Sequence, residues 1–142
     1  MRGEKIYEYE VEITGATDFG VTLEAILTGQ AAIPPSGARF DFGFAGRAEG
    51  RLSGKLTGTD YYRLRPDGRG ELNIRGVIET DDGARISMEA TGVATPTATG
   101  MDLVENVTLT TASPDYAWVN TRQIWAEGAS ADGKIRITGW LQ

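Results

Sequence analysis

The sequence predicts an all-β fold, a single antiparallel β-barrel of about eight to ten strands, and three observations support this prediction. Short segments in which apolar and polar residues alternate recur along the 142-residue chain. Turn-forming pairs such as Asp-Gly separate several of these segments. No segment has the periodicity of a helix longer than one or two turns. A chain of this length forms most simply one domain, residues 1–142, around one core.

The first third of the chain contains a strand, an ambiguous segment and a loop. In KIYEYEVEI, residues 5–13, tyrosine and aliphatic side chains alternate with glutamates, as in a strand with one solvated face. The segment GVTLEAILTG, residues 20–29, fits either a strand or a short helix, and we favour a strand. Two prolines block a sheet ladder in AAIPPSGA, so residues 31–38 are predicted to form a loop.

A glycine-rich stretch continues the aromatic strand ARFDFGFAG, residues 38–46. In GRAEGRLSGKLTG, residues 46–58, small and apolar residues alternate with charged and polar ones. This pattern predicts a long strand that its glycines bend, with Leu52, Gly54 and Leu56 facing the barrel interior and the basic side chains facing solvent. The inward glycines either make room for aromatic side chains across the barrel or leave a cavity for a ligand.

The rest of the chain consists of strands joined by turns. Residues 60–70 are predicted as a strand that ends in a Pro-Asp-Gly turn, and residues 71–93 as a hairpin around Asp82-Gly83. A single bent meander of this kind favours a barrel over a sandwich, because closure removes the strand edges. Further strands are predicted over residues 101–111, 116–128 and 131–141, the last with a turn at Asp132-Gly133.

Composition argues against several classes of function. The chain has 14 basic and 20 acidic residues, a net charge of −6, which argues against nucleic acid or an anionic membrane as a partner. It has no histidine and no cysteine, so it has no Ser-His-Asp triad, no thiol nucleophile, no disulfide and no zinc site of the usual kind. We expect no metal and no cofactor, although an all-oxygen calcium or magnesium site stays open. No apolar run reaches membrane length and glutamates interrupt the N-terminus, so we expect a cytoplasmic location.

Three ordered motifs carry a resemblance to a known family. They are GTDYYRLRPDGRGEL from Gly58, ETDDGARISMEATG from Glu79 and SPDYAWVNTRQIWAEG from Ser113. With them the chain resembles the bacterial domain-of-unknown-function family 3237, which consists of small calycin-like β-barrels. The resemblance covers residues 38–142 well and the first 37 loosely, and it implies the fold but no activity. Many members have tryptophan where this chain has Tyr61. The matching positions are Asp60, Tyr61, Thr80 to Ala84, Tyr116, Trp118 and Asn120.

Without histidine or cysteine, acid–base work falls to carboxylates, tyrosine, lysine or arginine. Asp60, beside Tyr61, is either a desolvated proton carrier or a structural residue that binds backbone N–H groups or an arginine. Glu105 shares a strand face with Leu103 and Val107. It lies either at the wet end of the strand or in a pocket that raises its pKa. The catalytic candidates are therefore Asp60, Tyr61 and Glu105.

The candidate ligand-binding residues combine aromatic walls with a few polar groups, the usual composition of a small-molecule pocket. The alternating face that begins at Tyr116 has this composition, although a core tryptophan with a polar rim explains it equally. The ligand-binding candidates are Phe42, Gly54, Trp118, Asn120 and Arg122.

Two functions remain open. The first is a cofactor-independent enzyme of isomerase, cyclase or lyase type that uses carboxylate and tyrosine acid–base chemistry on a small, partly apolar metabolite, with aromatic and unsaturated compounds as candidates. The second is a non-catalytic carrier or sensor of a small hydrophobic ligand. We favour the enzyme, and we expect a small molecule as the partner and a homodimer as the assembly.

Overall fold

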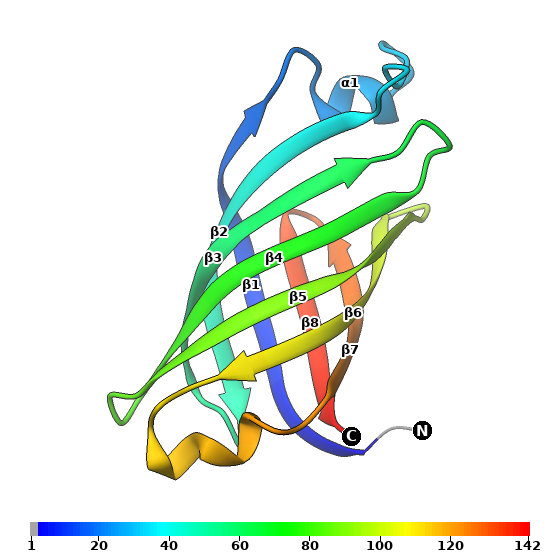
Figure 1. Cartoon of the computed structure of the whole chain (residues 1–142). Coiled ribbons are helices and arrows are strands. Elements are labelled where there is room, and N and C mark those ends of the chain that lie inside the picture. The colour runs from blue at the N-terminus through cyan, green and yellow to red at the C-terminus, as the bar shows by residue number, and fades with distance from the viewer. Residues whose placement is uncertain (1–2) are drawn as a thin grey trace.

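The computed structural model describes residues 3–142 and forms one barrel of long strands with two short helices at its ends (Figure 1). In chain order the elements are β1 (Glu4–Asp18), α1 (Leu23–Leu27), β2 (Ala38–Gly50), β3 (Gly54–Leu64), β4 (Gly70–Thr80), β5 (Arg85–Pro96), β6 (Gly100–Thr110), the 3₁₀ helix η1 (Pro114–Val119), β7 (Ile124–Ala131) and β8 (Lys134–Leu141).

The barrel is closed. Each strand pairs antiparallel with the next one along the chain, and β8 pairs with β1. The all-β antiparallel barrel predicted from the alternating segments is therefore confirmed, with eight strands among residues 3–142. The turns at Asp82-Gly83 and Asp132-Gly133 are also confirmed, since Gly83 and Gly133 have φ angles of +95° and +76°.

The glycine-rich stretch, residues 46–58, is a hairpin, and the prediction of one bent strand is wrong. β2 ends at Gly50, whose φ of +130° favours glycine, and β3 begins at Gly54. Leu52 lies in the turn, is fully buried, and donates its N–H to the carbonyl of Ile6. The alternation hides this reversal, because the inward and outward residues keep their period of two on both arms.

Several inward glycines make room for aromatic rings, which is the first of the two interpretations given above. A Cβ at Gly139 would lie 2.5 Å from Cζ of Tyr7, and a Cβ at Gly58 would lie 2.8 Å from Cζ of Phe44 and closer still to the carbonyl oxygen of Arg75 on β4. Gly54 packs differently, because a Cβ there would overlap the carbonyl oxygen of Glu79 on β4. These glycines allow rings and neighbouring backbones to approach closely on the inner face.

η1 lies at one end of the barrel (Figure 1), and buried side chains fill that end. Val119 of η1 is fully buried, and the hydroxyl of Tyr116 donates to the carboxylate of Asp82 at 2.8 Å. The predicted strand over residues 116–128 is therefore wrong in its first half, where Pro114 starts a helix instead. The largest fully buried side chains include Leu56, Ile78, Ile86, Met88, Leu109 and Ile124.

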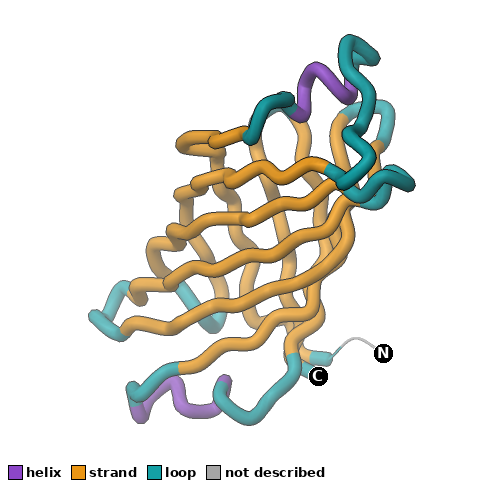
Figure 2. Tube along the Cα trace, turned by 45° about the horizontal axis from the view of Figure 1, so that its top comes forward, coloured by secondary structure: helices purple, strands orange, loops and turns teal. Residues whose placement is uncertain are grey.

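The opposite end carries α1 and the loop that follows it, both at the rim in Figure 2. The preference for a strand over residues 20–29 is wrong. Thr22 caps the helix by accepting the N–H of Ala25 with its Oγ1 at 3.1 Å. Leu23 and Leu27, one helical turn apart, both face the barrel opening.

Candidate functional site

The half of the barrel nearest α1 contains a cavity of about 340 Å³. All eight strands and α1 contribute side chains to its wall, which is mainly apolar. Among the described residues that line it, none is lysine or arginine. The lining residues are Tyr9, Val11, Ile13, Leu23, Leu27, Phe42, Phe44, Asp60, Tyr62, Leu72, Ile74, Ala94, Gly100, Met101, Leu103, Glu105, Ser130 and Ile135.

Asp60 is an inward-facing residue of β3 and lines this cavity. The pairing of β3 with β4 runs to Asp60 opposite Ile74 and resumes at Arg63 opposite Glu71. Within this gap the N–H of Asn73 donates to Oδ1 of Asp60 at 3.0 Å. Burial raises the pKa of Asp60 to about 6, although the Asn73 hydrogen bond favours the charged form.

Glu105, on β6, lines the same cavity and is only 1% exposed. Its Oε1 is buried and has no hydrogen-bond partner within residues 3–142. Burial, with a further contribution from the charge of Asp60, raises the pKa of Glu105 to about 8. The alternative that Glu105 lies at the wet end of its strand is therefore wrong, because β6 carries this position to the middle of the barrel wall, opposite Gly92 and Ala126.

Three tyrosines surround the two carboxyl groups. Tyr9 and Tyr62 line the cavity, and Tyr7 stacks on Tyr9 with ring centroids 5.8 Å apart. Burial, reinforced by the charge of Glu105, raises the pKa of Tyr7 and of Tyr9 well above the usual value for a phenol. Burial and the charge of Asp60 raise the pKa of Tyr62 to about 12. All three hydroxyls therefore stay protonated at neutral pH and can donate hydrogen bonds.

The two carboxyl groups differ in proton affinity. Between pH 6 and pH 8 Asp60 is ionised while Glu105 keeps its proton, as their raised pKa values of about 6 and about 8 require. A pair of this kind provides a base and an acid in one cavity. The arrangement can accept a proton from a bound molecule and donate a hydrogen bond to another of its atoms.

Of the three catalytic candidates, Asp60 and Glu105 lie together and Tyr61 does not. Tyr61 follows Asp60 directly, so its side chain points to the outer face of β3, where it is 36% exposed. Its ring lies 5.6 Å from the guanidinium of Arg39, which also contacts Phe19. Tyr61, predicted as a catalytic residue beside Asp60, is therefore not part of this cavity.

Three of the ligand-binding candidates lie at the other end of the barrel. Trp118, in η1, packs against the guanidinium of Arg51 at 3.7 Å. Asn120 bridges to the backbone of Thr111, accepting its N–H and donating to its carbonyl. Their assignment to the pocket is wrong, because η1 replaces the strand that would have aimed them inward. The same holds for Arg122, whose guanidinium donates to the main-chain oxygen of Gln142.

The remaining two ligand-binding candidates have opposite outcomes. Phe42 lines the cavity and stacks on Phe40, with ring centroids 6.0 Å apart. Gly54 lies at the far end of β3, against the backbone of β4, and does not line the cavity. Its assignment as a ligand-binding residue is wrong.

Sequence reasoning missed Tyr9, Tyr62 and Phe44 as cavity residues and the two leucines of α1. The signal for the first three was present, since all three stand on the inward set of an alternating strand. What alternation does not show is which part of the inner face stays unfilled, because that depends on which side chains meet across the barrel.

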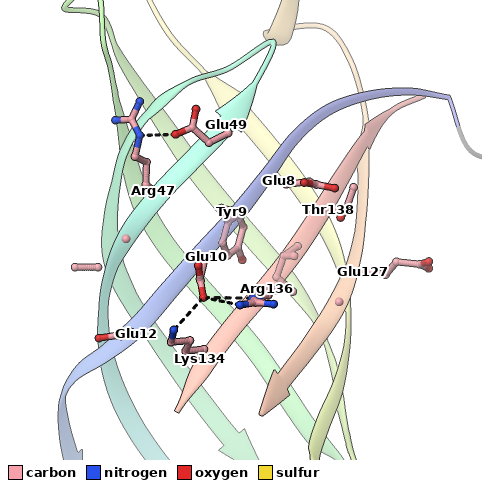
Figure 3. Close-up of a pocket in the computed structure, with 14 residues that line it drawn as sticks. Glu8, Tyr9, Glu10, Glu12, Arg47, Glu49, Glu127, Lys134, Arg136 and Thr138 are labelled. Carbon is pink, nitrogen blue, oxygen red and sulfur yellow. Dashed lines mark hydrogen bonds and ion pairs between the residues drawn. The ribbon is translucent and has the colours of Figure 1, made fainter. Parts of the chain in front are cut away.

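A second, shallower hollow lies on the outer face of β1, β2, β7 and β8 (Figure 3). All of its basic side chains pair with carboxylates of the same hollow: Arg136 with Glu10 at 3.2 Å, Lys134 with Glu10 at 3.7 Å, and Arg47 with Glu49 at 2.6 Å. These pairs are exposed and contribute little to stability. We place the candidate site in the barrel cavity, where two carboxyl groups are buried and neither pairs with a basic side chain within residues 3–142.

Within residues 3–142, the helices are too short to cross a membrane. A search of curated proteins finds no relative of this chain.

Solved structures share the fold. The chain superposes on a β-barrel-like protein from Acinetobacter baumannii with a TM-score of 0.80 and 19% identity, covering 97% of this chain and 93% of that one. A protein of unknown function from Clostridium acetobutylicum gives a TM-score of 0.83 and 22% identity, with coverage of 100% and 99%. An enzyme from Penicillium herquei gives a TM-score of 0.67 and 15% identity, with coverage of 100% and 96%. At these identities the likeness shows the fold alone. Residues 11–140 match the family described as proteins of unknown function, DUF3237, and the chain therefore belongs to that family.

Proposed function

We propose that the protein is a cofactor-independent acid–base enzyme, of isomerase, cyclase or lyase type, that acts on a small and largely apolar molecule in the barrel cavity. One observation carries the proposal. Asp60 and Glu105, the two carboxyl groups with raised pKa values, both face one apolar cavity that has no lysine or arginine in its described lining. Structural ion pairs do not explain them, since neither carboxylate pairs with a basic side chain within residues 3–142.

The two groups take different roles. Asp60, ionised at neutral pH and fixed by the N–H of Asn73, is the base. Glu105, protonated at neutral pH, is the acid. A positioned acid or base of this kind contributes about 10²- to 10⁴-fold to a rate. That one structural neighbour is itself described as an enzyme agrees with the proposal.

The test uses 5-nitrobenzisoxazole, a small apolar compound whose ring opens when a base removes one proton from carbon. The proton goes to the base, the N–O bond breaks, and the coloured cyanonitrophenolate is released. The reaction is fast only for a desolvated base, so dissolved acetate at the same pH is the reference. We expect the protein to exceed acetate and Asp60→Asn to lose about 10²-fold or more, because the amide that replaces the carboxylate cannot take the proton.

The matched control is Asp102→Asn, an exposed carboxylate on the outer face of β6. It should react at the rate of the unmodified protein. In the Asp60→Asn variant the side-chain amide oxygen can still accept the N–H of Asn73, so this variant should keep its melting temperature. A folded Asp60→Asn protein with unchanged turnover would contradict the proposal.

The second candidate function is a carrier of a small hydrophobic ligand, which the mainly apolar cavity wall favours. A carrier binds an apolar probe as tightly as an enzyme does but has no use for a desolvated base. Tight binding of a fluorescent apolar probe, with no rate above that of acetate, would favour the carrier.

A further inference from the structure

We propose that the substrate is a neutral, lipophilic β,γ-unsaturated ketone or aldehyde, and that Glu105 holds its carbonyl oxygen in the cavity while Asp60 moves the proton. This inference rests on the proposed acid–base function and names the substrate class of the same site.

The first step concerns two unpaired polar atoms, which lie in the cavity wall or directly behind it. Oε1 of Glu105 and the hydroxyl of Tyr7 are buried, and neither has a hydrogen-bond partner within residues 3–142. Buried polar groups are nearly always hydrogen-bonded, so unpaired ones need an explanation. Glu105 lines the cavity, and Tyr7 lies directly against the ring of Tyr9, which also lines it. A ligand in the cavity supplies the missing partner for Glu105.

The second step is the kind of atom that fits there. A protonated carboxylic acid at Glu105 and the hydroxyls of Tyr9 and Tyr62, which line the cavity, present O–H groups, so the ligand atom that binds them must accept hydrogen bonds. The described lining has no lysine or arginine to balance an anion, and the carboxylate of Asp60 repels one. A carbonyl oxygen meets both requirements, because it is neutral and accepts two hydrogen bonds without donating one.

The third step is the body of the ligand. Phe42, Phe44 and Tyr62 form one aromatic side of the cavity, and the rings of Phe42 and Tyr62 lie 6.1 Å apart, edge to face. Leu23 and Leu27 of α1 lie at the opening. Flat, unsaturated rings pack well against such a wall, and a cavity of about 340 Å³ accommodates a one- or two-ring compound.

The reaction that follows needs no other reactant. Asp60 takes a proton from the carbon between the carbonyl group and a C=C bond. The electron pair of that C–H bond moves towards the carbonyl oxygen, giving a dienolate whose oxygen accepts the hydrogen bond of Glu105. Asp60 then returns the proton to the far carbon of the dienolate, and the product is the conjugated isomer. Hydrogen-bond donors held in a dry site at the developing negative charge are the usual source of such acceleration.

The activity test uses cyclohex-3-en-1-one and a bicyclic β,γ-unsaturated ketone, followed by ultraviolet absorbance of the conjugated product. We expect Glu105→Leu, which removes the donor, to lose about 10²-fold or more. Glu105→Gln keeps an N–H donor and should lose less. Both variants should lose less than about tenfold with 5-nitrobenzisoxazole, because nitrophenolate is a weakly basic leaving group that needs little stabilisation. Glu12→Gln, on the outer face of β1, is the matched control.

A binding measurement tests the same site without turnover, using 4-nitrophenolate as a mimic of the dienolate. Asp60→Asn mimics the protonated aspartate of the intermediate, so it should bind 4-nitrophenolate at least about tenfold more tightly than the unmodified protein does. Adding Glu105→Leu should remove most of that gain. If the leucine variant fails to fold, Glu105→Gln should remove a smaller but measurable part of it, because its amide is a weaker donor than the acid.

The outcomes separate the two proposals. Asp60-dependent opening of 5-nitrobenzisoxazole without isomerisation of either ketone would overturn the ketone inference and leave the acid–base function standing. Unchanged isomerisation of both ketones by a folded Glu105→Leu protein would also overturn the ketone inference. If the protein accelerates none of these reactions beyond acetate, both proposals fail.

Discussion

The protonation state of the Glu105 carboxyl group affects the stability of the barrel. The groups that face it are Asp60 from β3 and the hydroxyls of Tyr7 and Tyr9 from β1, none of which is cationic. Its pKa rises from 4.5 in the unfolded chain to about 8 in the barrel. The folded state therefore holds this proton more tightly than the unfolded state, and the resulting stabilisation is complete below pH 4.5 and is lost as the pH rises towards 8. Asp60 adds a smaller contribution of the same sign, lost between pH 3.8 and about 6.

We therefore predict that Glu105→Gln flattens the pH dependence of the unfolding free energy. At about 1.4 kcal/mol per pKa unit, the glutamate costs the unmodified protein on the order of 5 kcal/mol by about pH 9 relative to about pH 4. The glutamine variant should match the unmodified protein at the acid end of this range and be several kcal/mol more stable at the alkaline end. Urea unfolding at about pH 4, 6 and 9 measures this. Glu12→Gln should follow the unmodified protein throughout, and parallel curves for Glu105→Gln would show that the buried carboxyl does not titrate on folding.

Gly54 gives a second prediction at this scale. The sequence placed Gly54 among the ligand-binding candidates, where a larger side chain would weaken binding more than the fold. Because a Cβ at this position would overlap the carbonyl of Glu79, even Gly54→Ala should destabilise, by about 1–3 kcal/mol or more. Gly15→Ala is the control, since no atom lies within 4 Å of a Cβ there. Thermal melts of the two variants test this prediction. Equal melting temperatures for Gly54→Ala and Gly15→Ala would contradict it and show that β4 shifts at little cost.

Single residues were predicted well where alternation alone decides their direction. It placed Phe42 and Glu105 on inner faces, and Asp60 shares that face on β3. The error with Tyr61 came from grouping it with its neighbour, although adjacent residues of a strand point to opposite sides. Gly54 faces inward as predicted, but the sequence does not show that a second strand lies directly against it.

At the scale of elements, α1 forms part of the opening and has little support of its own. It spans Leu23–Leu27, contains no fully buried residue and depends on the cap from Thr22. Loss of an N-cap of this type costs roughly 1 kcal/mol. We predict that Thr22→Ala speeds amide hydrogen exchange across residues 25–28 several-fold and leaves the exchange of β4 and β5 unchanged. Exchange at the same rate as in the unmodified protein would show that packing of Leu23 and Leu27 alone holds the helix.

The elements that sequence reasoning misassigned are the short ones. α1 and η1 have five and six residues, too few for helical periodicity to differ from strand alternation. η1 also depends on contacts far along the chain, such as that of Tyr116 with Asp82. The hairpin at residues 51–53 was missed because its turn has a buried Leu52 where a turn usually has polar residues.

At the scale of the whole molecule, the net charge of −6 and the buried carboxyl groups both disfavour the binding of an anionic ligand. We predict that 1-aminoanthracene, neutral at about pH 8, binds at least about tenfold more tightly than anilinonaphthalene sulfonate, which is an anion. The preference should shrink at about pH 5, where protonation of Asp60, with its pKa of about 6, removes the nearest charge. Fluorescence titration measures both. Met101→Trp, which adds volume at the cavity wall, should weaken the binding of both probes. If the affinities did not change in this variant, the probes would bind on the outer surface and not in the cavity.

The barrel could be predicted because many independent segments agree on it. Nearly every long segment alternates, Asp-Gly turns join three pairs of neighbouring strands, and no helix among the described residues is long enough to cover a sheet. The cavity could not be predicted in the same way. It exists because the inner side chains near η1 meet and fill the space, whereas those near α1 leave about 340 Å³ unfilled. Where side chains meet depends on how the strands tilt across one another.

β1 is longer than its partner β8. It pairs with β8 only as far as Glu12, opposite Lys134, whereas its pairing with β2 continues to Asp18. Residues 13–18 therefore have a side with backbone groups that β8 does not cover, and such a side invites another chain to add a strand. The register shift between Ile13 and Gly15 interrupts the regular spacing of those groups at the point where the uncovered side begins. The irregularity works as a safeguard against aggregation, so a substitution that restores regular pairing there would endanger solubility before it affected the cavity.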